Sequence, residues 1–122
     1  MSTEYNFEKL RVYQEALDFA ETIYQNTQGF PDRENFGITS QIRRAAVSIS
    51  SNLAEGSGRH HTKVFLEFLY QSRGSLYQVM TLIKLSQRLK YLDSQTKEEL
   101  LRLSDQIAIK LSNLINSLRK KD

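Results

Sequence analysis

Apolar residues recur every three to four positions in four long segments, at about residues 7–28, 34–55, 62–89 and 94–119. This spacing lines up one apolar stripe along a helix, and none of the segments shows the strict alternation of a half-buried strand. The connections between the segments are short, so consecutive helices are expected to be antiparallel. The pattern therefore predicts an all-α protein: a single domain over residues 1–122, folded as an antiparallel up-down-up-down four-helix bundle.

The same pattern predicts which side chains form the core. Positions three, four and seven apart face the same side of a helix, and the polar residues between them face solvent. We expect the first helix to bury Leu10, Tyr13, Ala16, Leu17, Ala20 and Tyr24; the second Ile38, Ile42, Ala45, Ala46, Ile49 and Leu53; the third Val64, Phe65, Phe68, Leu69, Leu76, Val79, Met80 and Ile83; and the fourth Leu100, Leu103, Ile107, Leu111, Leu114, Ile115 and Leu118.

The residues that break the pattern predict where the helices end. Gly29 followed by Pro31 is expected to end the first helix, and the glycines of residues 56–58 the second. Glycine readily adopts the left-handed conformation of a helix C-terminus, and proline cannot continue a hydrogen-bonded turn. Asp93 or Ser94 is the expected N-cap of the fourth helix.

The net charge of +3 is distributed unevenly along the chain. Residues 1–40 hold three basic and seven acidic side chains, residues 41–90 hold eight basic and two acidic, and the remainder six basic and five acidic. An excess of one sign in the middle of a chain indicates an anionic partner, or pairing between acidic and basic surfaces of different elements or subunits. The charge pattern alone leaves both possibilities open.

Other compositional features narrow the class of protein. The chain has no cysteine, which excludes disulfides, thiolate metal sites and cysteine nucleophiles. No apolar run approaches the roughly 20 residues of a membrane span, and the N-terminal residues lack the basic and apolar regions of a secretory signal. We therefore expect a cytoplasmic protein without a membrane partner.

One outward face of the third helix combines cations with aromatic rings. Lysines and tyrosines recur every seven residues, and Leu66, Arg73 and Arg88 flank them. Lysine and arginine neutralise phosphates and exposed tyrosines stack on unpaired bases, but tyrosine and arginine are also enriched in subunit interfaces. A solvated face, with the rings lying on lysine stems, is the third possibility. The row consists of Lys63, Tyr70, Tyr77, Lys84 and Tyr91.

The second helix has an unusual outward face as well, on which two arginines lie beside an apolar valine. We interpret the arginines together with the cations of the third helix as candidate phosphate contacts, and the valine and tyrosines as candidate oligomer contacts. The candidate nucleic-acid contacts are Arg43, Arg44, Arg59, Lys63, Arg73, Lys84 and Arg88, and the candidate interface residues are Val47, Tyr70 and Tyr77.

Sequence motifs of enzymes and metal sites do not fit this chain. The glycines of residues 56–58 follow a helix, whereas phosphate-binding loops follow a strand and begin a helix. His60 and His61 have no third ligand at a recognisable spacing, no arginine precedes them by four to six residues as in helical-bundle ribonucleases, and inward Glu-x-x-His pairs of di-iron bundles are absent from the sequence. We therefore expect no catalytic residues, metal or cofactor.

Polar residues at the edge of the second helix's apolar stripe are expected to be structural. Ser48 and Asn52 lie four residues apart, with Gln41 on the same side. A partly buried polar group destabilises a fold unless it is hydrogen-bonded. We expect this pair to tie the second helix to a neighbouring helix or loop, with a ligand-binding role as the alternative.

These motifs together resemble a known family. The residues that carry the likeness are Phe7-x-x-Leu10, Phe30-Pro31, the run Ser40-Gln-Ile-Arg-Arg-Ala-Ala-Val-Ser-Ile-Ser-Ser-Asn-Leu-Ala-Glu-Gly-Ser-Gly-Arg59, Phe65-x-x-Phe68-Leu69 and Gly74-Ser75-Leu76. Over nearly its whole length the chain is similar to the bacterial four-helix-bundle proteins of the 23S ribosomal RNA intervening-sequence family. It departs from them at Ser51, where the family often has proline, and at Gln78, where it often has glutamate.

The resemblance implies an antiparallel bundle that assembles into a ring-shaped homopentamer. Relatives include accessory variability proteins of diversity-generating retroelements, which are thought to bind RNA or DNA through basic surfaces and to partner a reverse transcriptase. For the intervening-sequence members the molecular role is unsettled. The motif residues that the resemblance carries over are Arg43, Arg44, Ser48, Asn52, Glu55, Gly56, Gly58 and Arg59, none of them catalytic.

Two functions remain for this sequence. The first is a non-enzymatic, homo-oligomeric bundle whose basic surface binds RNA or other nucleic acid, mainly through phosphates. The second is a protein-interaction scaffold whose basic and aromatic face forms subunit contacts or recruits a partner such as a reverse transcriptase.

Overall fold

The computed structural model describes residues 10–120, and within that range the regular structure is entirely helical. There is no strand in this part of the chain, so the prediction of an all-α protein with four long helices is confirmed. The α-helices are α1 (Arg11–Asn26), α2 (Ile38–Ser57), α3 (Thr62–Arg88) and α4 (Ser94–Arg119), with one short 3-10 helix, η2 (Asp32–Glu34), between α1 and α2.

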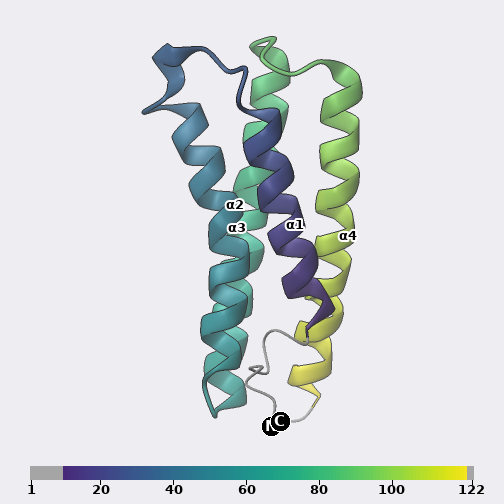
Figure 1. The fold of residues 1–122 in the computed structure, drawn as a ribbon. Helices are drawn as coiled ribbons and strands as arrows, with labels where there is room; N and C mark the ends of the chain where they lie inside the picture. The colour runs from purple at the N-terminus through teal and green to yellow at the C-terminus, as the bar shows by residue number, and fades with distance from the viewer. Residues whose placement is uncertain (1–9, 121–122) are drawn as a thin grey trace, which may run out of the picture.

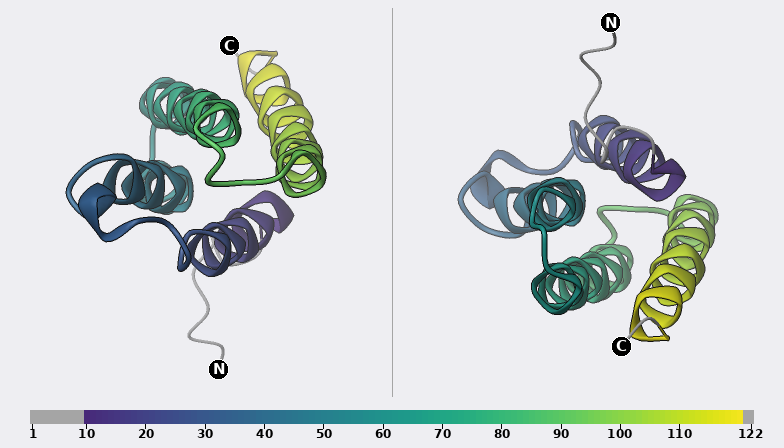
Figure 2. Two further views of the ribbon diagram at one scale, coloured as in Figure 1. Left: turned by 90° about the horizontal axis from the view of Figure 1, so that it is seen from above. Right: turned by 90° about the horizontal axis from the view of Figure 1, so that it is seen from below.

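The four helices lie side by side, with the α1–α2 and α3–α4 connections at one end and the α2–α3 connection at the other (Figure 1). Seen along their axes they form a ring in the order α1, α2, α3, α4 (Figure 2). The α2–α3 contact is the most extensive and the α1–α4 contact the smallest of the four. The molecule therefore has a tightly packed α2/α3 side and a looser α1/α4 side.

The helix boundaries differ from the predicted ones mainly at the first two helices. The structure places Leu10 in an extended conformation as the N-cap of α1, so the helix begins at Arg11 and not near residue 7. Residues 7–9 of the predicted helix lie outside the described range. The predicted start of α2 near residue 34 is wrong, because η2 ends there and the helix begins at Ile38. The bounds of α4 agree with the prediction, and α3 ends one residue earlier than expected.

The predicted core is correct for α2 and partly wrong for α1. All six predicted α2 positions are buried, but Leu17 and Tyr24 of α1 are 41% and 43% exposed. Val12, Phe19 and Ile23 are buried in their place. The apolar residues of α1 span an arc of about 160° at 100° per residue, wide enough for two different stripes to fit its periodicity, and only the neighbouring helices decide between them.

The outward face of α3 also needs one correction. Leu66, expected beside the lysine and tyrosine row, is only 8% exposed and belongs to the core. Val64, Phe65, Phe68 and Met80, expected in the core, are only partly buried.

The glycines do not end helices in the expected way. Gly56 lies inside α2 and is buried, and a Cβ there would come within 2.6 Å of Phe68 Cβ on α3. Gly58 is the C-cap but has a φ of −78°, and no glycine in the described range has a positive φ. Gly29 therefore does not form a left-handed cap, and α1 ends at Asn26 with Thr27 as its C-cap. Glycine is therefore required at residue 56 because α2 and α3 lie too close together there to leave space for a side chain.

A left-handed residue occurs at the end of α3 instead. Lys90 has a φ of 67°, and the N–H of Tyr91 donates to the carbonyl of Ser86 at 2.8 Å, which satisfies one of the last carbonyls of the helix. Asp93 then caps α4 by accepting a hydrogen bond from the N–H of Thr96 at 2.7 Å. Hydrogen bonds from the backbone and side chain of Thr96 lower the pKa of Asp93.

Candidate functional site

The α2/α3 side of the bundle carries a large excess of positive charge. Residues 38–88 contain seven basic and two acidic side chains. Four of the cations are exposed and form no ion pair with any residue of the described range. We call this set the open cations: Arg44, Lys63, Lys84 and Arg88.

The open cations are spread along the bundle. Lys63 and Arg88 lie at opposite ends of α3, 25 residues apart, which corresponds to roughly 37 Å at 1.5 Å per residue. Arg44 lies on α2, level with the middle of α3. They therefore extend along the whole α2/α3 side, a distribution that suits a charged polymer better than a single small anion.

Arg43, another candidate phosphate contact, is engaged in the fold. Its Nε donates to Thr27 Oγ1 at 2.9 Å and its Nη2 donates to the carbonyl of Tyr24 at 3.3 Å. The guanidinium also lies 4.6 Å from the centroid of the Tyr24 ring. A cation at the negative end of a helix dipole stabilises that end, so Arg43 acts chiefly as the clamp that fixes the C-terminus of α1 to α2.

Two further candidates are partly engaged by neighbours. Arg59 lies 3.6 Å from a carboxylate oxygen of Glu55 and 5.3 Å from the centroid of the Phe68 ring. The guanidinium of Arg73 lies 5.2 Å from the centroid of the Tyr70 ring. Both are held against aromatic rings, and Arg59 has its charge partly compensated as well.

Arg44 lies between two surface hollows. One, of about 340 Å³, runs between α2 and α3, and the other, of about 450 Å³, lies beside the C-terminus of α1. A cation on a ridge between two hollows is accessible from both. The first hollow is lined by Gln41, Arg44, Ala45, Ser48, Ser75 and Gln78, and the second by Tyr24, Asn35, Thr39, Ser40, Arg43 and Arg44.

The polar motif on α2 connects the two helices of this side. Ser75 Oγ of α3 donates to Ser48 Oγ at 2.9 Å, and Asn52 Nδ2 donates to both the carbonyl and the hydroxyl oxygen of Ser48. Deeper in the interface, Ser72 Oγ donates to the carbonyl of Ile49 at 2.8 Å. This is the geometry of a structural tie between α2 and α3.

The aromatic row on α3 is shorter than the sequence suggested. Tyr70 and Tyr77 are 39% and 51% exposed and lie between the exposed Lys63 and Lys84. Tyr91, however, lies beyond α3 and donates from its hydroxyl to Glu34 Oε2 at 2.8 Å. Tyr91 therefore has a structural role and is not part of the exposed row on α3.

The row and the α2/α3 hollow face different directions. Ser75 and Gln78 of α3 line the hollow, and at 100° per residue Tyr77 points about 100° away from Gln78 and about 160° from Ser75. The seven candidate cations therefore do not form one patch.

Val47, the candidate interface residue on α2, is 41% exposed.

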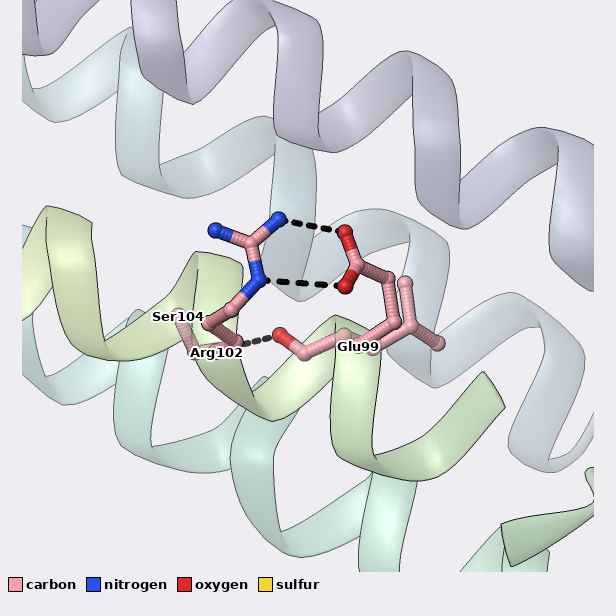
Figure 3. A network of polar contacts seen from close by, with 4 residues as sticks. Glu99, Arg102 and Ser104 are labelled. Atoms are coloured by element: carbon pink, nitrogen blue, oxygen red, sulfur yellow. Dashed lines mark hydrogen bonds and ion pairs between the residues drawn. The ribbon is translucent and has the colours of Figure 1, made fainter. Parts of the chain in front are cut away.

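The α1/α4 side is organised differently, because its charges are nearly balanced: residues 11–26 and 94–119 hold five basic and six acidic side chains. Lys110 Nζ lies 3.0 Å from Glu15 Oε1 across the two helices, and Lys97 lies 3.4 Å from Glu98. The guanidinium of Arg102 donates twice to the carboxylate of Glu99 (Figure 3), which lowers the pKa of Glu99. Three of the cations on this side are therefore paired, and the side as a whole has no excess of positive charge.

Sequence reasoning missed the most exposed apolar residue of the described range. Phe36, between η2 and α2, is 100% exposed. Its neighbours Asn35 and Gly37 are a turn-forming pair, and an aromatic residue isolated between such residues, outside any periodic apolar stripe, was the available signal.

The described residues contain neither a metal-binding cluster nor a membrane-spanning helix. No three histidine or acidic side chains within residues 10–120 come together in a way that could hold a metal ion. No helix in the same range combines the length and apolar character that a bilayer span requires.

Comparisons with known proteins are consistent with this architecture. No curated protein matches the chain. A crystal structure of a protein with unknown function from the S23 ribosomal protein family of Bacteroides thetaiotaomicron superposes with a TM-score of 0.76 at 22% sequence identity, covering 85% of this chain and 97% of that one. At this identity the likeness establishes the fold. The family profile described as 23S rRNA-intervening sequence protein matches residues 8–113. The chain therefore belongs to the 23S rRNA-intervening sequence protein family.

Proposed function

We propose that this protein is a non-enzymatic, self-assembling up-down-up-down bundle that binds RNA or other nucleic acid through the phosphates. The observation that carries the proposal is the set of open cations on the α2/α3 side. Exposed cations without acidic partners are attractive to a polyanion, whereas on the α1/α4 side Lys97, Arg102 and Lys110 are paired and acidic residues balance the rest.

The spacing of the open cations favours a nucleic acid over a small anion. Roughly 37 Å separates the ends of α3, far more than a single phosphate group spans. Phosphate contacts supply affinity without sequence information. Tyr70 and Tyr77, exposed between Lys63 and Lys84, are available to stack on unpaired bases, each stack contributing about 1–3 kcal/mol. This combination favours single-stranded or structured RNA with little sequence preference.

Assembly is the second part of the proposal. By its family resemblance the chain forms a homopentameric ring, and Val47, Tyr70 and Tyr77 are the exposed residues we expect in subunit contacts. In the alternative function the same face recruits a partner protein, such as a reverse transcriptase, in place of nucleic acid. Either function operates without catalytic residues or a cofactor, in the cytoplasm.

Salt dependence tests the nucleic-acid part of the proposal. Gel-shift titrations of the full chain with a single-stranded RNA, a structured RNA and a DNA duplex are carried out over a range of salt concentrations. The logarithm of the association constant should fall linearly and steeply with the logarithm of the salt concentration, and change little with sequence. Absence of binding to all three probes at low salt would refute it.

A further inference from the structure

An apolar side chain projects fully into solvent at one end of the bundle. Phe36 is 100% exposed, whereas the next most exposed large apolar residue of the described range, Ile109, is 62% exposed. An aromatic ring left in water is unfavourable by the free energy that its burial would recover. Such a residue is a candidate anchor for a partner surface.

The segment that presents Phe36 is fixed on both sides. Glu34 Oε1 accepts a hydrogen bond from the N–H of Ile38 at 3.2 Å, and Glu34 Oε2 accepts one from the hydroxyl of Tyr91 at 2.8 Å. The ring of Tyr91 also packs on Phe30, with a centroid distance of 5.4 Å. These contacts join the α1–α2 and α3–α4 connections, so Phe36 is held in a defined position, which reduces the entropy lost on binding.

Two further apolar residues are exposed at this end. Leu85 and Leu89 are 42% and 45% exposed and lie four residues apart, on one side of the end of α3. Leu85 comes seven residues after Gln78, so it faces the α2 side, as Gln78 does. The α1–α2 and α3–α4 connections share this end of the bundle (Figure 1). We call Phe36, Leu85 and Leu89 the end patch.

A hollow of matching size lies on another face of the same chain. Between α1 and α4 a cavity of about 220 Å³ is lined by three apolar residues, Phe19, Leu103 and Ile107. Since a cavity of about 150 Å³ accommodates benzene, this one has room for a phenyl ring. Its remaining lining residues are polar: Glu15, Asp18, Thr22 and Gln106.

The net charges around the two surfaces are of opposite sign. In the segments that carry the end patch, three exposed cations outnumber the two carboxylates of Asp32 and Glu34, and the α1/α4 hollow carries two carboxylates. The three cations are Arg33, Arg88 and Lys90. Glu15 Oε2 is buried and has no hydrogen-bond partner among the described residues, although Oε1 of the same carboxylate is paired with Lys110. A donor from an arriving surface would satisfy that oxygen.

We propose that the end patch of one copy docks on the α1/α4 hollow of a second copy, with the Phe36 ring seated in the hollow that Phe19, Leu103 and Ile107 line. Knob and hollow lie on different faces of each chain, so the contact is head-to-tail and repeats from copy to copy. This inference rests on the self-assembly part of the proposed function and specifies the surfaces that meet.

Sedimentation velocity on four full-length proteins tests the contact. Phe36→Ser removes the knob, and its side chain is fully exposed, so the fold should be unaffected. Gln106→Trp, at an exposed position of the lining, obstructs the hollow. Each variant should raise the dissociation constant at least about 30-fold, the effect of a typical hot-spot residue. Ile109→Ser, the matched control at another exposed apolar position, should leave assembly unchanged.

Mixing the two variants gives the sharpest result. Phe36→Ser retains an intact hollow and Gln106→Trp retains an intact knob, so an equimolar mixture should form dimers while each variant alone is monomeric. Dimer formation in the mixture would support the head-to-tail contact, and its absence would overturn it.

The remaining outcomes separate this inference from the proposed function. A monomeric wild-type protein would overturn self-assembly and this contact together. Wild-type oligomers that tolerate Phe36→Ser would overturn only this contact, most directly if the double variant Tyr70→Ser, Tyr77→Ser lowers the mass. Weaker RNA binding by Phe36→Ser at unchanged mass would also overturn it, since the ring would then contact nucleic acid.

Discussion

The two sides of this bundle use charge in opposite ways. On the α1/α4 side, three of the basic residues lie within ion-pair distance of a carboxylate: Lys97, Arg102 and Lys110. Among the described cations of the α2/α3 side, only Arg59 has an acidic partner. The open cations Arg44, Lys63, Lys84 and Arg88 have none within the described residues. Surface ion pairs contribute at most about 1 kcal/mol each, so the difference concerns what each side can bind more than how stable it is.

The packing of the two sides differs as well. The α2/α3 contact is the most extensive in the molecule and includes a helical glycine that lets the two backbones approach. It also includes the buried hydrogen bond from Ser72 to the carbonyl of Ile49. The α1/α4 contact is the smallest and borders a hollow. The basic α2/α3 side is therefore closely packed, and the α1/α4 side is packed more loosely.

The largest expected effect comes from disturbing the close α2/α3 packing. In Gly56→Ala the new Cβ would lie 2.6 Å from Phe68 Cβ, so the two helices must move apart. We expect the free energy of unfolding to fall by about 2 kcal/mol, an overpacking cost that exceeds the gain in helix propensity. Chemical denaturation monitored by circular dichroism measures it.

The same substitution on the facing helix provides the control. A Cβ at Gly74 would meet nothing within 4 Å, so Gly74→Ala should stabilise the protein by about 0.5–1 kcal/mol through helix propensity. Equal effects of the two substitutions on the free energy of unfolding would show that α2 and α3 do not approach closely at Gly56.

An intermediate effect should separate two adjacent arginines. Arg43→Gln removes the hydrogen bonds to Thr27 and to the carbonyl of Tyr24, and should lower the free energy of unfolding by about 1–2 kcal/mol. Arg44→Gln, at an exposed position without such contacts, should change it by less than about 0.5 kcal/mol but weaken RNA binding. Thermal denaturation and gel-shift assays on both variants measure the pair; the reverse pattern would assign the clamp to the wrong residue.

The smallest effect is a pH dependence at the end where the two sides meet. Hydrogen bonds from the Tyr91 hydroxyl and from the N–H of Ile38, with the nearby Arg33, lower the pKa of Glu34 from its ordinary value. A carboxylate with a lowered pKa in the folded state adds stability above its unfolded pKa, and that stability is lost as pH falls through the folded value. The wild-type protein should therefore be more stable than Glu34→Gln at neutral pH, and the difference should shrink as pH falls and vanish once Glu34 is protonated in the folded state. Melting temperatures of both proteins from pH 3 to 7 check this, and a difference independent of pH would contradict it.

The sequence predicted those features that depend on one helix or on its ends. The α2 stripe falls in a single arc, so its six buried residues followed from periodicity alone, and Asp93 was identifiable as a cap from its position. The α1 stripe was not predictable, because apolar residues cover more than one face of that helix.

Features that depend on contacts between two segments could not be predicted from the sequence. The partner of Arg43 lies 16 residues away on another element, so nothing in the local pattern distinguished it from Arg44. The role of Gly56 depends on the approach of Phe68, and the exposure of Phe36 depends on the contacts of Glu34 and Tyr91. The candidate site was therefore predicted as a set of residue types, and the structure divides it into clamps and open cations.

The most direct test of the account compares two variants with the same change in net charge. In one, Arg44, Lys84 and Arg88 of the α2/α3 side are replaced by glutamine; in the other, Lys97, Arg102 and Lys110 of the α1/α4 side are. Association constants for a single-stranded RNA are measured at several salt concentrations.

The α2/α3 variant should lose affinity, and the slope of log association constant against log salt should decrease in magnitude by about 2, as expected for three lost phosphate contacts. The α1/α4 variant should bind almost as the wild-type protein does. Equal losses in the two variants would mean that only net charge matters, and would contradict the assignment of binding to the α2/α3 side.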